Sequence, residues 1–474
     1  MPAGARLELR LGLLVFLFTM AAAGYLLLVR RPLLTLGGLT DEWLPLGYNL
    51  AAYGTLGWGS EPILLRPPGY PAFIAGVLRL ATRVPARLTP SYHVIAIALV
   101  LLAQAVLLAV TAALLFAWLR RRVGNALAFA AALLYGLNPY SLVLPGLLHY
   151  DVLHLFLLVA GCAALDLALA RADDTLSPLA AAGALWGIAA LVRPVTLPLP
   201  LFVLVMILAR GLRGRRAATA ALAFSLAMAA VIAPWTARNY GLTGRLIPIN
   251  VQGWAVLWGS TVMPFRLDPN QYQWAAVAAA YMRPIHRRVT GKEYDYPGYL
   301  EHNVALEAAY KEDALRNLGR QPQVYLWNVA RGFLSLSLQI NTSLVSVFQR
   351  IQRTGEMVSQ TWFWEHAEAE RRETRTSRAT GVLAALLTVL AGIGIARGVA
   401  RRDPFLLVPG LVYLCVAGAH TLVLVDFMYY YVRLPFLIVF AALGAEALGT
   451  WGRKLAAALV ALALAASAVL LLGV

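Results

Sequence analysis

Two adjacent carboxylates, Asp41 and Glu42, follow the first long apolar run of the chain. A carboxylate beside a membrane is costly unless it faces water or a partner, so this pair indicates function. An ionised carboxylate can accept the proton of an attacking hydroxyl group, which makes Asp41 and Glu42 the candidate catalytic residues. Thr40 could also cap a helix whose first turn holds both acids, and the two roles are compatible.

Arginine and tyrosine side chains near the ends of apolar runs could neutralise and hold a departing phosphate group. The candidate substrate-binding residues are Arg66, Tyr70, Arg193, Arg238, Tyr431 and Arg433. For Arg193 and Arg433 the ordinary alternative is that they extend from span ends to the lipid headgroups. Arg66 could likewise hold a lipid phosphate without binding substrate.

His149 and Asp151 stand two residues apart in a short segment between two apolar runs. Imidazole and carboxylate groups are common ligands of divalent metal ions, so this pair is a candidate metal site beside Asp41. Two residues are a small ligand set. A divalent metal is therefore a candidate cofactor, and a site without metal stays open as the alternative.

The composition excludes an ordinary soluble protein. Of the 474 residues, 60% are hydrophobic and 13% are charged, whereas soluble domains carry roughly 25% charged residues. The net charge of +17 lies largely in arginine clusters between apolar runs, such as Arg120 to Arg122. This placement is the positive-inside pattern of membrane proteins and argues against a nucleic-acid partner. The sequence predicts an all-α polytopic protein of the cytoplasmic (inner) membrane.

We predict about eleven transmembrane helices, each near the roughly 20 residues that cross a bilayer. Seven belong to an N-terminal module of residues 1–237, whose first outer loop covers 29–93, and four lie in residues 379–474. With a cytoplasmic N-terminus, this loop and Asp41 are on the extracytoplasmic side. The predicted spans cover about 11–28, 94–118, 125–142, 151–170, 179–192, 195–210, a run ending at Pro234 and Trp235, 379–396, 404–424, 429–449 and 455–472.

Residues 238–378 differ from the rest of the chain, because they hold about half of its acids and no spanning run. They predict one extracytoplasmic soluble domain, mixed or mostly helical. Its middle, from Val304 to Leu336, has helical apolar spacing that is interrupted near Gly319 and Pro322. This helix could lie on the bilayer surface or pack in the domain's own core, and the spacing leaves both open.

Ordered motifs along the chain resemble the C-type glycosyltransferases. The resemblance is greatest to the bacterial branch related to the protein O-mannosyltransferases and to the aminoarabinose transferase that modifies lipid A. The outer domain matches in placement and in one helical run. The motifs are Thr40-Asp41-Glu42 with Tyr48, Ala51 and Gly54; Arg66-Pro67-Pro68-Gly69-Tyr70-Pro71; Leu191-Val192-Arg193-Pro194; Ala233-Pro234-Trp235-Thr236-Ala237-Arg238-Asn239-Tyr240 with Gly244; Pro322-Gln323-Val324-Tyr325-Leu326; and Tyr431-Val432-Arg433-Leu434-Pro435.

The resemblance implies a C-type glycosyltransferase fold and an inverting transfer of a sugar from a polyprenyl- or dolichyl-phosphate donor. The acceptor would be a hydroxyl group of a lipid, glycan or protein at the outer face of the membrane. It also implies Asp41 as the general base, Asp151 as an acid of the second outer loop, and metal use in some relatives. Position 66 is Arg where the aminoarabinose branch has Lys, and the C-terminal element reads Tyr-Val-Arg rather than adjacent Arg-Tyr.

Two functions of other classes remain open from the sequence. One is a transporter or flippase of a polyprenyl-linked glycan, and the other is a noncatalytic scaffold of the cell envelope. A transporter would need ionisable residues inside its spans, and Asp166 is the main one here. The chain shows no internal repeat, which is the usual signature of such transporters.

Overall fold

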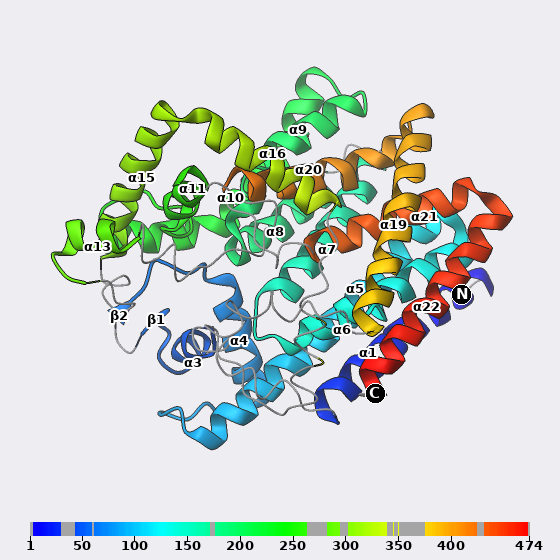
Figure 1. Cartoon of the computed structure of the whole chain (residues 1–474), viewed down its shortest axis with the longest axis horizontal. Helices are drawn as coiled ribbons and strands as arrows, with labels where there is room; N and C mark the ends of the chain where they lie inside the picture. The colour runs from blue at the N-terminus through cyan, green and yellow to red at the C-terminus, as the bar shows by residue number, and fades with distance from the viewer. Residues whose placement is uncertain are drawn as a thin grey trace.

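The computed structural model describes residues 3–29, 43–58, 61–170, 176–262, 282–293, 302–338, 345, 349, 375–423 and 431–472. Asp41 and Glu42, the predicted catalytic residues, lie outside the described residues. What is described is almost entirely helical (Figure 1). Two short strands, β1 (Gly57–Trp58) and β2 (Glu61–Pro62), form an antiparallel ladder within residues 29–93, the segment predicted as the first outer loop.

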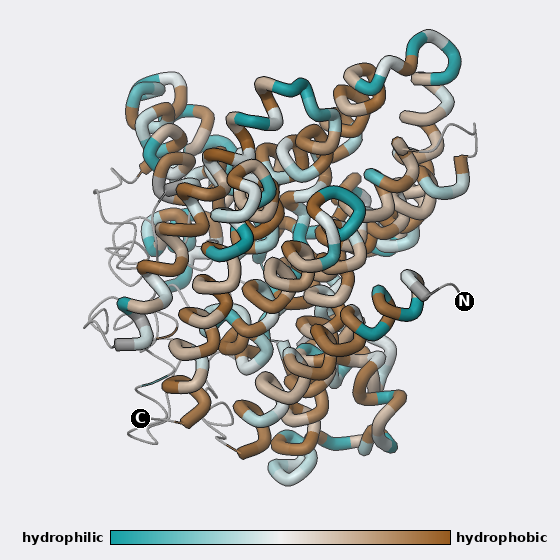
Figure 2. The backbone as a smooth tube through the Cα atoms, turned by 90° about the vertical axis from the view of Figure 1, so that its right-hand side faces the viewer, coloured by the Kyte–Doolittle hydropathy of each residue, from teal (hydrophilic) through white to brown (hydrophobic). Residues whose placement is uncertain are grey.

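Seven helices in the described part of the chain are long and apolar enough to cross a membrane. Figure 2 shows their apolar character along the backbone. Shorter helices complete the bundle: α4 (Gly69–Ala81), α8 (Ser177–Val192), α9 (Leu199–Ala209) and α21 (Leu434–Ala447). The chain is thus a multi-pass α-helical membrane protein. The seven long helices are α1 (Ala3–Leu28), α5 (Pro90–Gly136), α7 (Asp151–Ala170), α10 (Gly214–Thr243), α19 (Arg375–Ala400), α20 (Leu407–Leu422, after a turn of 3-10 helix, η5, at Pro404–Leu406) and α22 (Gly449–Leu472).

Where the structure describes them, the predicted spans fall largely on these helices. The second and third spans are the two helical parts of α5, which are separated at Gly124, where φ of +76° and ψ of 168° are non-helical and a side chain would be strained. The seventh predicted span ends at Pro234 and Trp235, and the helix that contains it, α10, continues to Thr243. Contacts beyond the proline hold this extension, since Trp235 Nε1 and Asn239 Nδ2 both donate to the carbonyl of Ile249, at 2.8 and 2.9 Å.

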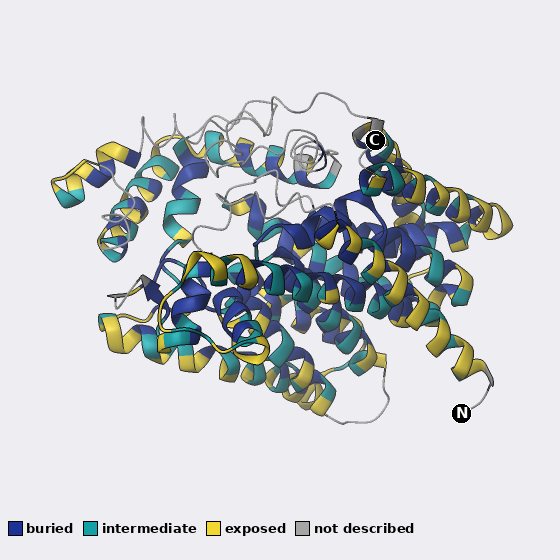
Figure 3. Cartoon of the chain, turned by 90° about the horizontal axis from the view of Figure 1, so that it is seen from below, coloured by how far each residue is buried: buried dark blue, intermediate teal, exposed yellow. Residues whose placement is uncertain are grey.

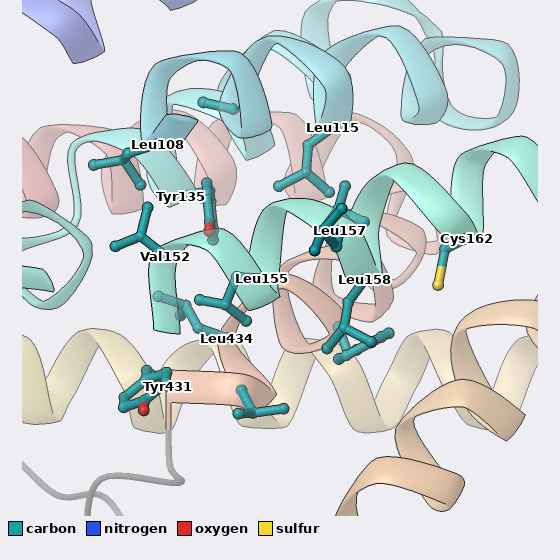
Figure 4. Packing of buried hydrophobic residues seen from close by; sticks show 14 of the residues in the cluster. Leu108, Leu115, Tyr135, Val152, Leu155, Leu157, Leu158, Cys162, Tyr431 and Leu434 are labelled. Atoms are coloured by element: carbon teal, nitrogen blue, oxygen red, sulfur yellow. The ribbon is translucent and has the colours of Figure 1, made fainter. Parts of the chain in front are cut away.

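The buried core runs through most helices of the bundle, and within it α5 packs against both α7 and α21. Figure 4 shows their side chains interlocking, among them Leu108 and Leu115 of α5, Val152 and Leu155 of α7, and Leu434 of α21. The outward faces of the long helices are exposed (Figure 3). Apolar exposure there is ordinary in a membrane protein, where lipid rather than water covers the surface.

Helices α19 and α21 approach closely where Gly394 faces Gly444. A Cβ added at Gly394 would overlap the carbonyl oxygen of Phe440 and lie 2.7 Å from the Gly444 nitrogen, whereas one added at Gly392 would meet nothing within 4 Å. We expect Gly394→Ala to lower the free energy of unfolding by about 1–3 kcal/mol, as overpacking does. Gly392→Ala is the control in the same helix. Thermal unfolding of both variants in detergent measures the difference, and equal midpoints would contradict the close approach.

Between α10 and α19 the described residues form α11 (Gly253–Val262), α13 (Arg283–Thr290), α15 (Asn303–Arg320) and α16 (Pro322–Leu338). The predicted helix of this region, with its break near Gly319 and Pro322, is confirmed. Glu307 of α15 holds the start of α11, since its two carboxylate oxygens accept hydrogen bonds from the backbone nitrogens of Trp254 (2.6 Å) and Ala255 (3.3 Å). Burial raises the pKa of the Glu307 carboxyl, and these two donors act against that shift.

Candidate active site

Aromatic rings and one guanidinium group surround Trp43, the first residue of α3 (Trp43–Tyr53), which follows the predicted catalytic pair directly. The guanidinium of Arg66 lies 5.7 Å from the centroid of the Trp43 ring. Three rings meet that of Trp43 edge-on, with centroid distances of 5.5 Å for Tyr70, 5.4 Å for Tyr150 and 6.2 Å for His149. The fold therefore joins the first outer loop to the segment before α7, although the two are far apart in sequence. We call these five residues the Trp43 cluster.

A buried pair of opposite charges adjoins the Trp43 cluster. Asp151 begins α7 and is 1% exposed, and Arg193 caps the C-terminus of α8 and is 6% exposed. Arg193 Nη1 donates to Asp151 Oδ1 at 3.4 Å, and Asp151 Oδ2 contacts His149 Nδ1. Arg193 also lies 5.1 Å from the centroid of the Tyr150 ring. Burial at this level means that Arg193 does not reach out to lipid headgroups, and its charge is held by Asp151.

The pair His149 and Asp151 does not by itself fit a divalent metal ion. Both carboxylate oxygens of Asp151 already face donors, and one of these is the cationic guanidinium of Arg193, which would repel a metal ion. Among the residues that the structure describes, no group of three or more His, Cys, Asp and Glu side chains could hold a metal. Any part that Asp41 takes in metal binding stays a prediction, since it lies outside the described residues.

The side chain of Arg238 connects the end of α10 to the first outer loop through hydrogen bonds. Its Nη1 donates to the carbonyl of Ile63 and its Nη2 to that of Leu56, both at 3.2 Å, and its guanidinium stacks 4.2 Å over the ring of Trp235. These backbone contacts hold the loop segment just before Arg66. The Arg238 side chain thus positions the loop by binding the loop's backbone carbonyls.

The segment after α10 completes this attachment. Asn250 Nδ2 donates to the carbonyl of Leu65 at 2.8 Å, and the backbone nitrogen of Val251 donates to that of Leu64 at 3.0 Å. Gln252 Oε1 accepts a hydrogen bond from Arg66 Nη1 at 3.4 Å. Arg66 is therefore held from two sides, by Trp43 and by this segment.

Gln104 of α5 is a site residue that the sequence analysis missed. It is completely buried, accepts a hydrogen bond from the Tyr70 hydroxyl at 2.9 Å, and donates to the carbonyls of Pro145 (2.9 Å) and Leu147 (2.8 Å). It thereby fixes α4 relative to the segment that carries His149. An amide inside an apolar span was the signal that could have identified it.

Tyr431 and Arg433 stand just before and at the start of α21. Electrostatic interactions link the Tyr431 hydroxyl to Asp151 and Arg193, so it adjoins the buried pair. Arg433 is buried too, but it donates to the carbonyl of Ser337 and, at 3.5 Å, to Thr388 Oγ1. The structure therefore gathers Arg66, Tyr70, Arg193 and Tyr431 around the Trp43 cluster and the buried pair. It places Arg238 and Arg433 in contacts with neighbouring segments of the protein.

No protein-family model matches the sequence, and no curated protein matches it either. The structure is similar to that of the Archaeoglobus fulgidus oligosaccharyltransferase in the apo form, with a TM-score of 0.53 and 13% identity over 96% of this chain. The chain has the fold of the C-type glycosyltransferases. It spans 56% of the oligosaccharyltransferase chain, and at such identity the likeness concerns the fold.

Two liganded structures are also similar. One is the archaeal oligosaccharyltransferase AglB from Archaeoglobus fulgidus in complex with an inhibitory peptide and a dolichol-phosphate, with a TM-score of 0.51 and 14% identity over 98% of this chain and 55% of that chain. The other is ArnT from Cupriavidus metallidurans bound to undecaprenyl phosphate, with a TM-score of 0.38 and 17% identity over 95% of this chain and 78% of that chain.

Proposed function

We propose that this protein is an inverting glycosyltransferase that moves a sugar from a polyprenyl-phosphate donor to a hydroxyl of a lipid, glycan or protein. The reaction would take place on the extracytoplasmic side of the cytoplasmic membrane. The observation that carries the proposal is the Trp43 cluster with the adjoining Asp151–Arg193 pair, which stands directly after the predicted base. A member of the same fold, AglB, has been solved with a dolichol-phosphate.

In this scheme Asp41 accepts the proton of the acceptor hydroxyl, with Glu42 beside it. The acceptor oxygen forms a bond to the anomeric carbon as the bond from that carbon to the phosphate oxygen breaks. The polyprenyl phosphate leaves with the electron pair, and Arg66 and Arg193 neutralise its added negative charge. One base and one neutralised leaving group suffice for inversion, so a second catalytic carboxylate is not needed.

The other candidates take supporting roles. We assign Tyr70 and Tyr431 to the phosphate-binding group, because Tyr70 adjoins Trp43 and Tyr431 interacts with Arg193. Arg238 positions the loop that carries Arg66, in place of the direct substrate contact that the sequence suggested.

The competing transport hypothesis relied on Asp166 as an ionisable group inside a span. Asp166 accepts hydrogen bonds from Arg210 Nη2 and Trp118 Nε1, both at 3.2 Å, and lies 3.7 Å from Arg122. These partners come from α5 and the end of α9, so Asp166 ties three helices together at one end of the bundle. Its partners give it a structural role, and no other observation favours transport.

A reconstituted assay separates transfer from transport. The purified protein is placed in liposomes with a panel of radiolabelled undecaprenyl-phosphate hexoses and pentoses and an extract of envelope lipids and glycans as acceptor. We expect label to appear in a new glycosidic bond, with the anomeric configuration inverted relative to the donor. Movement of donor across the bilayer without a new bond would contradict the proposal and support a flippase.

Gly69 sets the distance between the first outer loop and Arg193. A Cβ at Gly69 would lie 2.6 Å from the backbone nitrogen of Val192, whereas one at Gly76 in the same helix would meet nothing within 4 Å. We expect Gly69→Ala to displace Arg66 and to lower the transfer rate by about 10²-fold, as misplacement of about 1 Å can do. Gly76→Ala is the matched control and should retain the rate. Equal rates in the two variants would show that this contact does not position the site.

A further inference from the structure

Helix α16 runs beside a membrane span over most of its length (Figure 1). Near its start, the Tyr325 hydroxyl donates to the carbonyl of Leu422, the last residue of α20, at 2.8 Å. Near its end, Ser337 Oγ shares a hydrogen bond with the Tyr413 hydroxyl of α20 at 3.2 Å. The stretch of α20 from Tyr413 to Leu422 is about 14 Å long. Because α20 is a candidate span, α16 lies antiparallel to it through almost half of a hydrocarbon core of about 30 Å.

The face of α16 that points away from the protein is apolar. Leu326 is 63% exposed, Trp327 60% and Leu334 57%, and Ala330 between them is exposed as well. These positions recur at helical spacing and form one stripe. On α20 beside it, Leu414 and Leu422 are exposed in the same way, so the apolar surface continues onto a span. Large exposed apolar stripes are unfavourable in water and ordinary against lipid.

Two polar groups of α16, the Asn328 side chain and the Ser337 carbonyl, have partners within the protein. Asn328 Nδ2 donates to the carbonyl of Ser260 in α11 at 2.7 Å. At the C-terminal end of α16, the Ser337 carbonyl accepts a hydrogen bond from the buried guanidinium of Arg433, a favourable contact between a cation and the negative end of a helix. Beside the exposed stripe, the guanidinium of the partly buried Arg331 lies 5.9 Å from the Trp327 ring centroid. An arginine beside a tryptophan is typical of the boundary between headgroups and acyl chains.

We propose that α16 is inserted into the bilayer to about half its depth, with Leu326, Trp327, Ala330 and Leu334 against lipid acyl chains. From the sequence, residues 238–378, which include this helix, are expected to form a soluble domain. Insertion makes α16 the membrane anchor of α11, to which Asn328 joins it. The direction of the helix sets the order of depth: Leu326 and Trp327 lie at the outer edge of the acyl chains and Leu334 lies deepest, and the long side chain of Arg331 extends toward the headgroups. This proposal stands independently of the catalytic function.

Spin labels on single cysteines test the insertion. The labels are placed by Leu326→Cys, Leu334→Cys and, as a matched control, Leu315→Cys, since Leu315 is 51% exposed on the outer-domain helix α15. The two native cysteines are buried and form no disulfide. The protein without an added cysteine is treated with the same spin label, and its signal corrects for any reaction at these two residues. The protein is reconstituted in vesicles of phosphatidylethanolamine and phosphatidylglycerol. Collisions with oxygen, which concentrates in acyl chains, are compared with collisions with a water-soluble nickel chelate.

We expect the ratio of oxygen to nickel collisions to be low at 315, higher at 326 and highest at 334. A ratio at 334 equal to that at 315 would place α16 in water and overturn the proposal. Low collision rates with both reagents at 326 and 334 would also overturn it, because they would mean that protein, such as a second copy of the chain, covers the stripe.

Discussion

Asp41→Asn is expected to lower the rate of sugar transfer by about 10²–10⁴-fold, the usual contribution of a positioned general base. Asparagine keeps the shape of aspartate but cannot take the proton of the acceptor hydroxyl. Folding, membrane insertion and donor binding should be unchanged, because donor binding is assigned to the arginines of the site. Initial rates in proteoliposomes, together with binding of undecaprenyl phosphate to the purified variant, measure the two effects separately.

The neighbouring acid supplies the control for this prediction. Glu42→Gln removes an equal charge one residue away, and we expect it to reduce the rate less than Asp41→Asn does. The opposite order would make Glu42 the base. Full activity in Asp41→Asn would remove Asp41 from the chemistry.

Asp151→Ala is expected to cost about 3–5 kcal/mol of stability, because it leaves the guanidinium of Arg193 buried without its carboxylate. The effect is measured as the shift in the unfolding midpoint of the detergent-solubilised protein. The control is Glu312→Ala, which removes an ion pair with Arg316 whose N–O distance is 2.6 Å. That pair lies on the surface, with the Glu312 side chain 69% exposed, and such pairs contribute about 0–1 kcal/mol.

A double variant distinguishes a buried charge from lost packing at position 151. If the cost of Asp151→Ala comes from the uncompensated cation, then Arg193→Leu added to it should recover part of the lost stability. A double variant less stable than Asp151→Ala would contradict this explanation. The double variant should also lack transfer activity, because it removes Arg193, a member of the proposed phosphate site.

The membrane helices were predictable because a bilayer requires long apolar runs, and those runs are visible in the sequence. The break at Gly124 was predictable as well, since the arginine cluster before it separates two predicted spans, and the structure has two helical parts of α5 on either side of this glycine. No pattern in the sequence indicated how α16 is oriented. Its apolar spacing predicted a helix, but spacing alone does not tell whether lipid or protein covers each face.

The candidate site was predictable in part. Charged and aromatic residues at span ends indicated Arg66, Tyr70 and Arg193, and the structure brings them to one region. Arg238 was also singled out, but its partners are backbone carbonyls of Leu56 and Ile63, which no pattern of residue types reveals.

Other parts of the site depend on distant contacts. Trp43 was passed over because a tryptophan at the start of an apolar helix is ordinary in sequence. Its importance comes from Arg66, Tyr150 and His149, which reach it from two separate segments.

An experimental structure of the protein with bound undecaprenyl phosphate tests the central claim most directly. The quantity to measure is the position of the phosphate relative to Asp41, Arg66 and Arg193. We predict a phosphate within hydrogen-bond distance of at least one of the two arginines, and an Asp41 carboxylate that faces the same cavity. An Asp41 carboxylate that points away from that cavity, or a phosphate bound at the other side of the membrane, would contradict it.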